Sequence, residues 1–368
     1  MPLYPKLLRP MLFRGDPETV HDRAIRAAAW ASAHPALLSA LSSLHAFHHP
    51  VLRTGVAGLE FANPFGLAAG LDKNGRAVPF WAALGFGHVE IGSVSADFSA
   101  GNLKPRLFRI PQDRGLVVHY GLPNDGAAAV ARRLAGTRFP VPLGINIVNT
   151  NHGPGAPAEC NEAVVDDYAR SCRALLPHAA YLVLNLSCPN TPDGRGFLSD
   201  SCRLRGLLQR LGELEPAKPV FLKVAPFRDT AQLEGFLAAV DSAPFVSGFS
   251  TNLPPGKPPG LLTPAAQLGR MPGAVSGHPS QALALQTVSD LYRRMDRRRY
   301  AIIASGGVFC AADAYAFIRQ GASLVQLLTA LVYEGPGVVR AIGDGLAELL
   351  ARDGFGRVSD AIGADSGR

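Results

Sequence analysis

The chain has 368 residues, of which 47% are hydrophobic and 18% are charged, and its formal net charge is +7. This composition is typical of a compact, soluble protein with a large core, and it excludes an intrinsically disordered chain. The basic balance fits anionic ligands or an anionic membrane surface. The sequence contains no zinc-finger, homeodomain or RNA-binding signature, so nucleic acid is not expected as a partner.

The cysteines indicate reduced thiols, with neither a disulfide framework nor a metal site. Their number is odd and no CxxC pair or paired-histidine spacing occurs; they are Cys160, Cys172, Cys188, Cys202 and Cys310. No segment approaches the ~18 consecutive apolar residues of a membrane-spanning helix. The N-terminus also lacks the basic start, long apolar run and cleavage site of a signal peptide.

Residues 1–50 predict a helical extension with apolar stripes. Asp16 is a plausible N-cap with Pro17 at the first helical position, which opens a helix that runs to about Trp30. Two further stripes at helical spacing consist of Leu3, Leu7, Leu8, Met11 and Leu12, and of Leu37, Leu38, Leu41, Leu44 and Phe47. With basic residues beside them, such helices suit a membrane interface. The alternative is that their apolar faces pack on the rest of the protein.

Residues 51–368 alternate short apolar strands with longer helical segments, which implies parallel pairing through crossovers. The predicted strands are 66–70, 87–93, 142–148, 181–186, 219–224, 245–251, 300–305 and 322–328. The predicted helices between them include 163–176, 230–240, 281–294 and 311–320. Eight such repeats favour an α/β fold of the (β/α)₈ TIM-barrel type. No GxGxxG fingerprint follows the first strand, which counts against a Rossmann domain.

The carboxyl ends of the predicted strands carry polar residues and glycines, as expected for the active face of a barrel. Gly306 and Gly307 form a turn whose N–H groups suit a phosphate. Strand 181–186 delivers Asn185 and, in the following loop, Cys188 and Asn190. These side chains suit a small polar molecule held beside a proton-abstracting group. The alternative is a strand followed by a proline-rich turn with a small buried cysteine.

Several motifs together resemble the dihydroorotate dehydrogenases, and within them the class 2, membrane-associated, quinone-using type. The resemblance covers nearly the whole chain. It rests on DPETVH at 16–21, NPFGLAAGLDKNG at 63–75, EIGS at 90–93, KPRLFR at 104–109, GINI at 144–147, NLSCPNT at 185–191, KVAP at 223–226 and GASLVQ at 321–326.

The resemblance implies an FMN-dependent oxidation of (S)-dihydroorotate to orotate, a step of pyrimidine biosynthesis, with a quinone as electron acceptor. The residues expected around FMN are Ala68, Ala69, Gly70, Ser93, Asn146, Lys223, Thr251, Gly277, Gly307 and Thr329. Lys73, Asn185, Asn190 and Asn252 are expected to hold the substrate, with Cys188 as the base. His21, Arg106 and Arg109 are expected at the quinone tunnel. The same resemblance implies peripheral attachment to the cytoplasmic face of a membrane, or a cytoplasmic protein if the quinone role is lost.

The chain departs from the class 2 pattern at five positions. Cys188 stands where the class 2 base is usually serine, and Val118, Leu122, Leu253 and Leu328 replace an amide, an aromatic residue, a threonine and a tyrosine. Each unpaired polar group on a buried substrate costs roughly 1–3 kcal/mol. Two such losses, at Val118 and Leu253, would weaken the binding of dihydroorotate about 10²-fold or more. The same chemistry on another carboxylate or amide is therefore an alternative, and a flavin-binding protein without turnover is a third hypothesis.

Overall fold

The computed structural model describes residues 4–153, 155–157, 159–188 and 196–367. Its N-terminal part is helical, as predicted, with η1 (Tyr4–Leu8), α1 (Arg9–Leu12), α2 (Pro17–Ser32) and α3 (Pro35–His45). The Asp16 carboxylate accepts a 2.8 Å hydrogen bond from the Thr19 N–H, and Pro17 occupies the first turn of α2. This cap satisfies one of the N–H groups that a helix start leaves without a partner, so α2 begins where the sequence places it.

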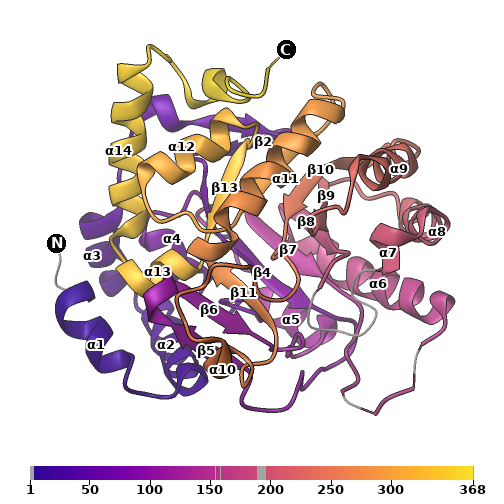
Figure 1. Cartoon of the computed structure of the whole chain (residues 1–368), viewed down its shortest axis with the longest axis horizontal. Helices are drawn as coiled ribbons and strands as arrows, with labels where there is room; N and C mark the ends of the chain where they lie inside the picture. The colour runs from indigo at the N-terminus through magenta and orange to yellow at the C-terminus, as the bar shows by residue number, and fades with distance from the viewer. Residues whose placement is uncertain (1–3, 154, 158, 189–195, 368) are drawn as a thin grey trace.

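Eight parallel strands close into a barrel at the centre of the molecule (Figure 1). In order around the barrel they are β3 (Phe65–Leu67), β4 (His88–Val94), β7 (Leu143–Ile147), β8 (Tyr181–Asn185), β9 (Val220–Val224), β10 (Val246–Thr251), β12 (Ala301–Ser305) and β13 (Leu324–Leu327). Each of the eight predicted strands overlaps one of them, so the predicted barrel is confirmed. The strands are almost wholly buried because helices cover their outer faces.

The helices around the barrel also follow the sequence pattern. The predicted four are α6 (Asn161–Leu175), α9 (Thr230–Val240), α11 (Gln281–Arg294) and α12 (Ala311–Arg319). The others are α4 (Val78–Ala83), α5 (Ala127–Leu134), α7 (Gly196–Ser199), α8 (Ser201–Gly212), α10 (Ala265–Leu268), α13 (Thr329–Glu334) and α14 (Val338–Arg352). Short 3₁₀ turns are η2 (Pro50–Leu52), η3 (Pro111–Asp113), η4 (Leu176–His178), η5 (His278–Ser280) and η6 (Val358–Ala361).

Two small sheets were not predicted. A hairpin of β1 (Thr54–Val56) and β2 (Leu59–Phe61) precedes the barrel, and Val56 and Phe61 share a buried cluster with Tyr181, the first residue of β8. The hairpin therefore closes the end of the barrel at which the strands begin. A second, antiparallel sheet has the order β11 (Ala274–Gly277), β6 (Gly115–Val118) and β5 (Leu107–Ile110).

The sheet of β5, β6 and β11 lies at the opposite, active end of the barrel. Strands β5 and β6 belong to the connection that follows β4, and β11 belongs to the connection that follows β10. Both connections leave the carboxyl ends of barrel strands, so the sheet they form must lie beside that mouth. Helix α2 packs against β5, and η1 packs against α13, which brings the N-terminal helices to the same end (Figure 1).

The N-terminal helices leave large apolar side chains on the surface. Leu7, Met11, Trp30 and Leu44 are each more than half exposed. Part of the predicted apolar stripe therefore does not pack on the barrel. Among the described residues, no helix has the length and hydrophobicity needed to cross a bilayer.

Candidate active site

A cavity of about 850 Å³ connects the mouth of the barrel to the space between α2 and α3. Most of the residues predicted for the site lie on its wall, although they come from distant parts of the sequence. They are His21, Ala68, Ala69, Gly70, Lys73, Ser93, Arg109, Asn185, Cys188, Lys223, Asn252, Gly277, Gly307 and Thr329. Asn146, Thr251 and Arg106 do not line the cavity. Asn190 lies outside the described residues.

A buried ionic group forms the floor of this cavity. Glu90, on β4, is fully buried and accepts hydrogen bonds from Lys223 Nζ at 3.2 Å, Asn146 Nδ2 at 2.9 Å and Gln326 Nε2 at 2.7 Å. An isolated charge in such a place would be expensive, whereas a pair with additional hydrogen bonds is tolerated. Lys223 is therefore held as a fixed cation at the cavity wall. Asn146 acts one layer behind that wall by orienting Glu90.

A row of polar side chains continues from this floor across the mouth of the barrel. Ser93 Oγ donates to Asn146 Oδ1 and accepts a 3.0 Å hydrogen bond from Asn185 Nδ2. Asn252 Nδ2 lies 3.2 Å from Asn185 Oδ1 and 3.1 Å from Ser187 Oγ. The two amides Asn185 and Asn252 are thus fixed relative to each other, which suits the recognition of a planar polar ring.

Cys188 follows this row, just beyond the end of β8. Its side chain is 4% exposed and lies on the cavity wall. The backbone before it is held firmly, because the Tyr168 hydroxyl donates a 2.6 Å hydrogen bond to the Asn185 carbonyl and Ser187 Oγ donates to the Lys223 carbonyl. The thiol is therefore presented to the cavity from a rigid strand end, next to the amides.

Glycines on the opposite wall allow close approach of a ligand. Gly277 and Gly307 have φ values of 94° and 71°, and a Cβ atom on Gly307 would lie 2.9 Å from the Gly277 carbonyl oxygen. The Gly307 N–H donates to no other described residue. Beside it, Ser276 Oγ and Thr329 Oγ1 lie 3.2 Å apart. This combination of an available N–H, hydroxyls and no side-chain volume fits a phosphate group, so the residues present fit a phosphate-bearing flavin.

Thr251 supports this wall from behind. Its hydroxyl accepts a 2.7 Å hydrogen bond from the Ser305 N–H, and Ser305 Oγ donates to the Thr251 carbonyl at 2.7 Å. These bonds tie the carboxyl ends of β10 and β12 together just before the turn at Gly306 and Gly307. Thr251 therefore shapes the cavity without being exposed to it.

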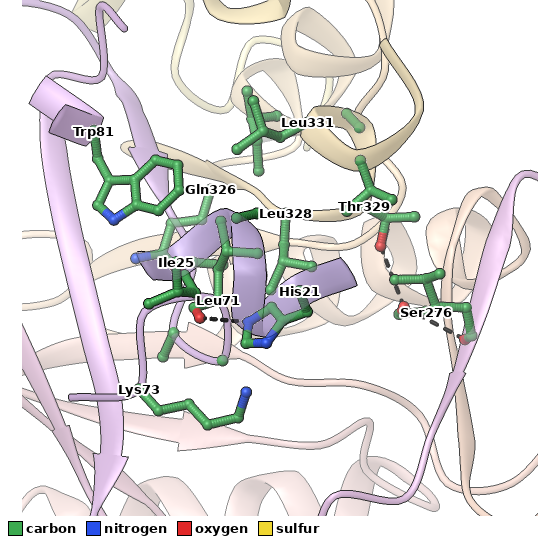
Figure 2. A pocket seen from close by; sticks show the side chains of 18 of the residues that line it. His21, Ile25, Leu71, Lys73, Trp81, Ser276, Gln326, Leu328, Thr329 and Leu331 are labelled. Carbon is green, nitrogen blue, oxygen red and sulfur yellow. Dashed lines mark hydrogen bonds between the residues drawn. The ribbon is translucent and has the colours of Figure 1, made fainter. Parts of the chain in front are cut away.

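Lys73 reaches the cavity from the loop that follows β3 (Figure 2). Asp72 organises this loop, since its carboxylate accepts from the Arg76 and Ala77 N–H groups and from Trp81 Nε1. Lys73 Nζ makes no hydrogen bond or ion pair with any described residue, and it lies 4.0 Å from the centre of the Tyr120 ring. Burial lowers the pKa of Lys73 to about 8. The ammonium is accessible only because it faces the cavity.

His21 lies where the barrel mouth meets the space between the N-terminal helices (Figure 2). Its Nε2 is 2.8 Å from the Leu71 carbonyl oxygen. Because a carbonyl only accepts, this nitrogen carries the proton. Burial, reinforced by the nearby charge of Lys73, lowers the pKa of His21 to about 4. The imidazole is therefore neutral at pH 7.

The two predicted tunnel arginines have different places. Arg109 lines the cavity, and its guanidinium is anchored by the Gly15 carbonyl at 2.7 Å and by the Phe13 ring at 4.7 Å. Arg106 is 8% exposed and donates to both carboxylate oxygens of Glu18. Its guanidinium is held by this pair, so it braces α2 from outside the cavity.

The four departures from the class 2 pattern in the pocket all reach the cavity wall, namely Val118, Leu122, Leu253 and Leu328. A Cβ atom on Gly70 would lie 3.5 Å from Leu328 Cδ1, so Leu328 packs next to the loop that follows β3. Leu122 adopts a left-handed backbone with φ of 64°, a conformation that costs about 1 kcal/mol or more for a leucine. The wall between the polar row and the N-terminal helices is consequently apolar.

Comparison with known proteins identifies the family. The model of the dihydroorotate dehydrogenase family matches residues 51–350. The chain belongs to this family. A protein of Sphingopyxis alaskensis named dihydroorotate dehydrogenase (quinone) is 41% identical over 343 residues, which are 90% of this chain and 92% of that protein. A protein of Roseiflexus castenholzii with the same name is 40% identical and covers 98% of this chain and 96% of its own length.

Solved structures agree with this assignment. A ligand-free DHODH from Eimeria tenella superimposes with a TM-score of 0.82 at 30% identity, over 96% of this chain and 100% of that one. A DHODH from the same organism in complex with ferulenol gives a TM-score of 0.81 over 95% and 96% of the two chains, also at 30% identity. The chain is thus of the class 2 type, as its motifs predicted, and it is an oxidoreductase acting on a CH–CH bond.

Several residues that the structure places in the site were assigned no role from the sequence. Glu90 and Gln326 lay inside quoted motifs, and a charged or amide side chain within an otherwise apolar strand was the signal that could have found them. Ser276 lies on β11, a strand that was not predicted. Tyr120 gave no sequence signal, because its importance depends on Lys73, which approaches it only in the folded chain.

Proposed function

We propose that this chain oxidises (S)-dihydroorotate to orotate and passes the electrons to a quinone, as a step of pyrimidine biosynthesis. The observation that carries the proposal is the single cavity that joins Lys73, Asn185, Cys188 and Lys223 to the apolar space beneath α2 and α3. A polar chamber for an anionic substrate and an apolar entrance for a quinone are the two requirements of this reaction. The names of the relatives support the same substrate and acceptor.

FMN is the cofactor that the site favours. When bound, it supplies the hydride acceptor and the connection to the quinone. Gly277, Gly307 and Thr329 would hold its phosphate through N–H and hydroxyl groups, and Ala68, Ala69 and Gly70 would leave room for its ring. Lys223, fixed by Glu90, would place a positive charge beside it. A fixed cation in a dry site favours a cofactor that becomes anionic on reduction.

Cys188 would act as the base. It would take a proton from one carbon of the C–C bond that is oxidised, and the hydride of the neighbouring carbon would pass to FMN, so that a C=C bond forms. Lys73 would bind the carboxylate of the substrate, and Asn185, Asn190 and Asn252 its amides and carbonyls. The hydrogen bonds that fix Asn185 and Asn252 before any ligand arrives favour one orientation of the ring.

The N-terminal helices would admit the quinone. Residues 1–50 would form the membrane- and quinone-associated extension and residues 51–368 the catalytic barrel. His21 and Arg109 would lie on the quinone path, whereas Arg106 would support it from outside the cavity. The exposed Leu7, Met11, Trp30 and Leu44 support peripheral attachment at the cytoplasmic face of a membrane.

Flavin reduction without oxygen tests this function. The purified protein should be yellow, and dihydroorotate should bleach it within seconds, whereas a water-soluble quinone should then restore the colour. Cys188→Ala should slow the bleaching about 10²- to 10⁴-fold, and Cys188→Ser should retain part of the rate. Cys202→Ala is the matched control, because Cys202 is exposed on α8. A protein that dithionite bleaches but dihydroorotate does not would refute the proposed substrate.

A further inference from the structure

The ammonium of Lys73 lies over the ring of Tyr120. Nζ lies 4.0 Å from the ring centre, within the range of a cation–π contact. No carboxylate or carbonyl of the described residues holds this nitrogen. The direction in which the lysine points is therefore set by Tyr120 and by the loop at Asp72, and both leave the ammonium facing the cavity.

Tyr120 is itself held by a buried arginine. The Arg106 guanidinium lies 5.3 Å from the centre of the same ring. It cannot move freely, because Arg106 Nη1 donates to the carbonyls of Ala100 at 2.6 Å and Asn102 at 2.9 Å. The Tyr120 hydroxyl, by contrast, is buried and has no partner among the described residues. The ring, and not the hydroxyl, is what the surroundings fix.

The arginine is in turn anchored by helix α2. Glu18 is 7% exposed and accepts from Arg106 Nε at 3.1 Å and from Arg106 Nη2 at 2.9 Å. One turn further along the same face of α2, His21 donates to the Leu71 carbonyl, two residues before Lys73. Helix α2 thus supports the lysine in two ways. One is the Tyr120 ring below the ammonium, which Arg106 and Glu18 hold. The other is the backbone at Leu71, to which His21 is hydrogen-bonded (Figure 2).

We propose that Tyr120, held by the Glu18–Arg106 pair, is a positioning residue that aims Lys73 at the carboxylate of the substrate, so that helix α2 sets the affinity for that anion. The proposal rests on the proposed function for the identity of the anion only. It gives α2 a part in substrate binding in addition to its place at the quinone entrance.

The charges around Lys73 agree with this arrangement. Asp22 and Glu18 on α2 and Asp72 in the loop favour the protonated lysine, whereas Arg106 and the burial itself oppose it. His21 is neutral at pH 7 and adds no charge. A buried ammonium keeps its proton only when nearby negative charge stabilises it. The electron-rich face of the Tyr120 ring stabilises the protonated form in the same way as the carboxylates do.

Orotate titrations of the FMN-loaded, full-length protein test the proposal. Tyr120→Leu should weaken orotate binding roughly 3- to 30-fold, the range expected for a lost cation–π contact. Tyr120→Phe keeps the ring and should restore most of the affinity. In a Lys73→Met background, Tyr120→Leu should have no further effect, because the group that it positions is gone. An equal loss in both backgrounds would overturn the proposal.

The role of α2 is tested with Glu18→Gln, which should weaken orotate binding several-fold in the wild-type chain and much less in the Tyr120→Leu chain. Lys104→Met is the matched control, because Lys104 contacts the same carboxylate at 3.2 Å but from an exposed position. This control should leave the affinity unchanged. A Glu18→Gln effect of the same size in both backgrounds would show that α2 acts on the site by another route.

A carbon-13 NMR titration of labelled lysines separates this proposal from the proposed function. Tyr120→Leu should lower the pKa of Lys73 further, because the charged form loses its stabilising ring. A protein that does not bind orotate but shows this shift would refute the substrate and keep the positioning role. If the protein binds orotate but Tyr120→Leu leaves the pKa of Lys73 unchanged, the positioning role is refuted and the proposed substrate is kept.

Discussion

Lys73 should make the folded protein less stable, and its replacement by methionine should reveal by how much. Its pKa falls from 10.5 in water to about 8 in the fold, chiefly because of burial. At 1.36 kcal/mol per unit, this fall corresponds to a destabilisation of about 3 kcal/mol at pH 7. Partial access to the cavity makes that figure an upper bound. Methionine matches the length of the lysine stem, so Lys73→Met should gain up to this amount.

The pH dependence identifies the cause. The folded chain binds fewer protons than the unfolded chain between pH 8 and 10.5, so its stability rises over this window. The destabilisation is complete below pH 8 and disappears above the unfolded pKa. The gain from Lys73→Met should therefore be full at pH 7 and small at pH 10.5.

Urea denaturation of both proteins at the two pH values measures this gain. Lys218→Met is the control, because Lys218 Nζ donates to three carbonyls, those of Leu176, Pro177 and Ala179, and its loss should destabilise the protein. At pH 7 a 3 kcal/mol gain would raise the melting temperature by about 4 °C for a chain of this length. Two results would show that the ammonium is well solvated in the fold. One is a Lys73→Met protein that is less stable than the unmodified chain at pH 7. The other is a change in the free energy of unfolding that is equal at pH 7 and pH 10.5.

Three further predictions concern the cavity, the ion pair at its floor and the loop that follows β10. Orotate affinity should fall about tenfold per pH unit above pH 8, as Lys73 loses its proton, and a flat profile measured by flavin absorbance would contradict this. Glu90→Leu leaves the Lys223 ammonium unpaired, so it should destabilise the protein by about 3–5 kcal/mol in urea denaturation, and a loss below about 1 kcal/mol would argue against a charged pair. Asp113 accepts from the N–H groups of Leu262 and Thr263, so Asp113→Ala should speed limited proteolysis in residues 254–264, and an unchanged cleavage rate would show that other contacts hold this loop.

The barrel was predictable because its signals are local. A buried parallel strand is a short apolar run, and a helix such as α9 consists of eleven consecutive residues that directly follow its Asp229 cap. The antiparallel sheet was not predictable, because β11 pairs with β6 from more than 150 residues away. Neither strand alternates clearly between polar and apolar residues, and only the closure of the barrel brings the two connections together.

The sequence by itself determined the barrel, the family and most side chains of the cavity, because strand ends and family motifs are written in consecutive residues. Tertiary structure alone decided how these side chains are used. It placed Arg106 on Glu18 instead of in the cavity, put Asn146 and Thr251 behind the wall, and brought Tyr120 beneath Lys73. Such roles depend on which charges meet after folding, since a buried charge must find a partner and the chain order does not say which one it finds.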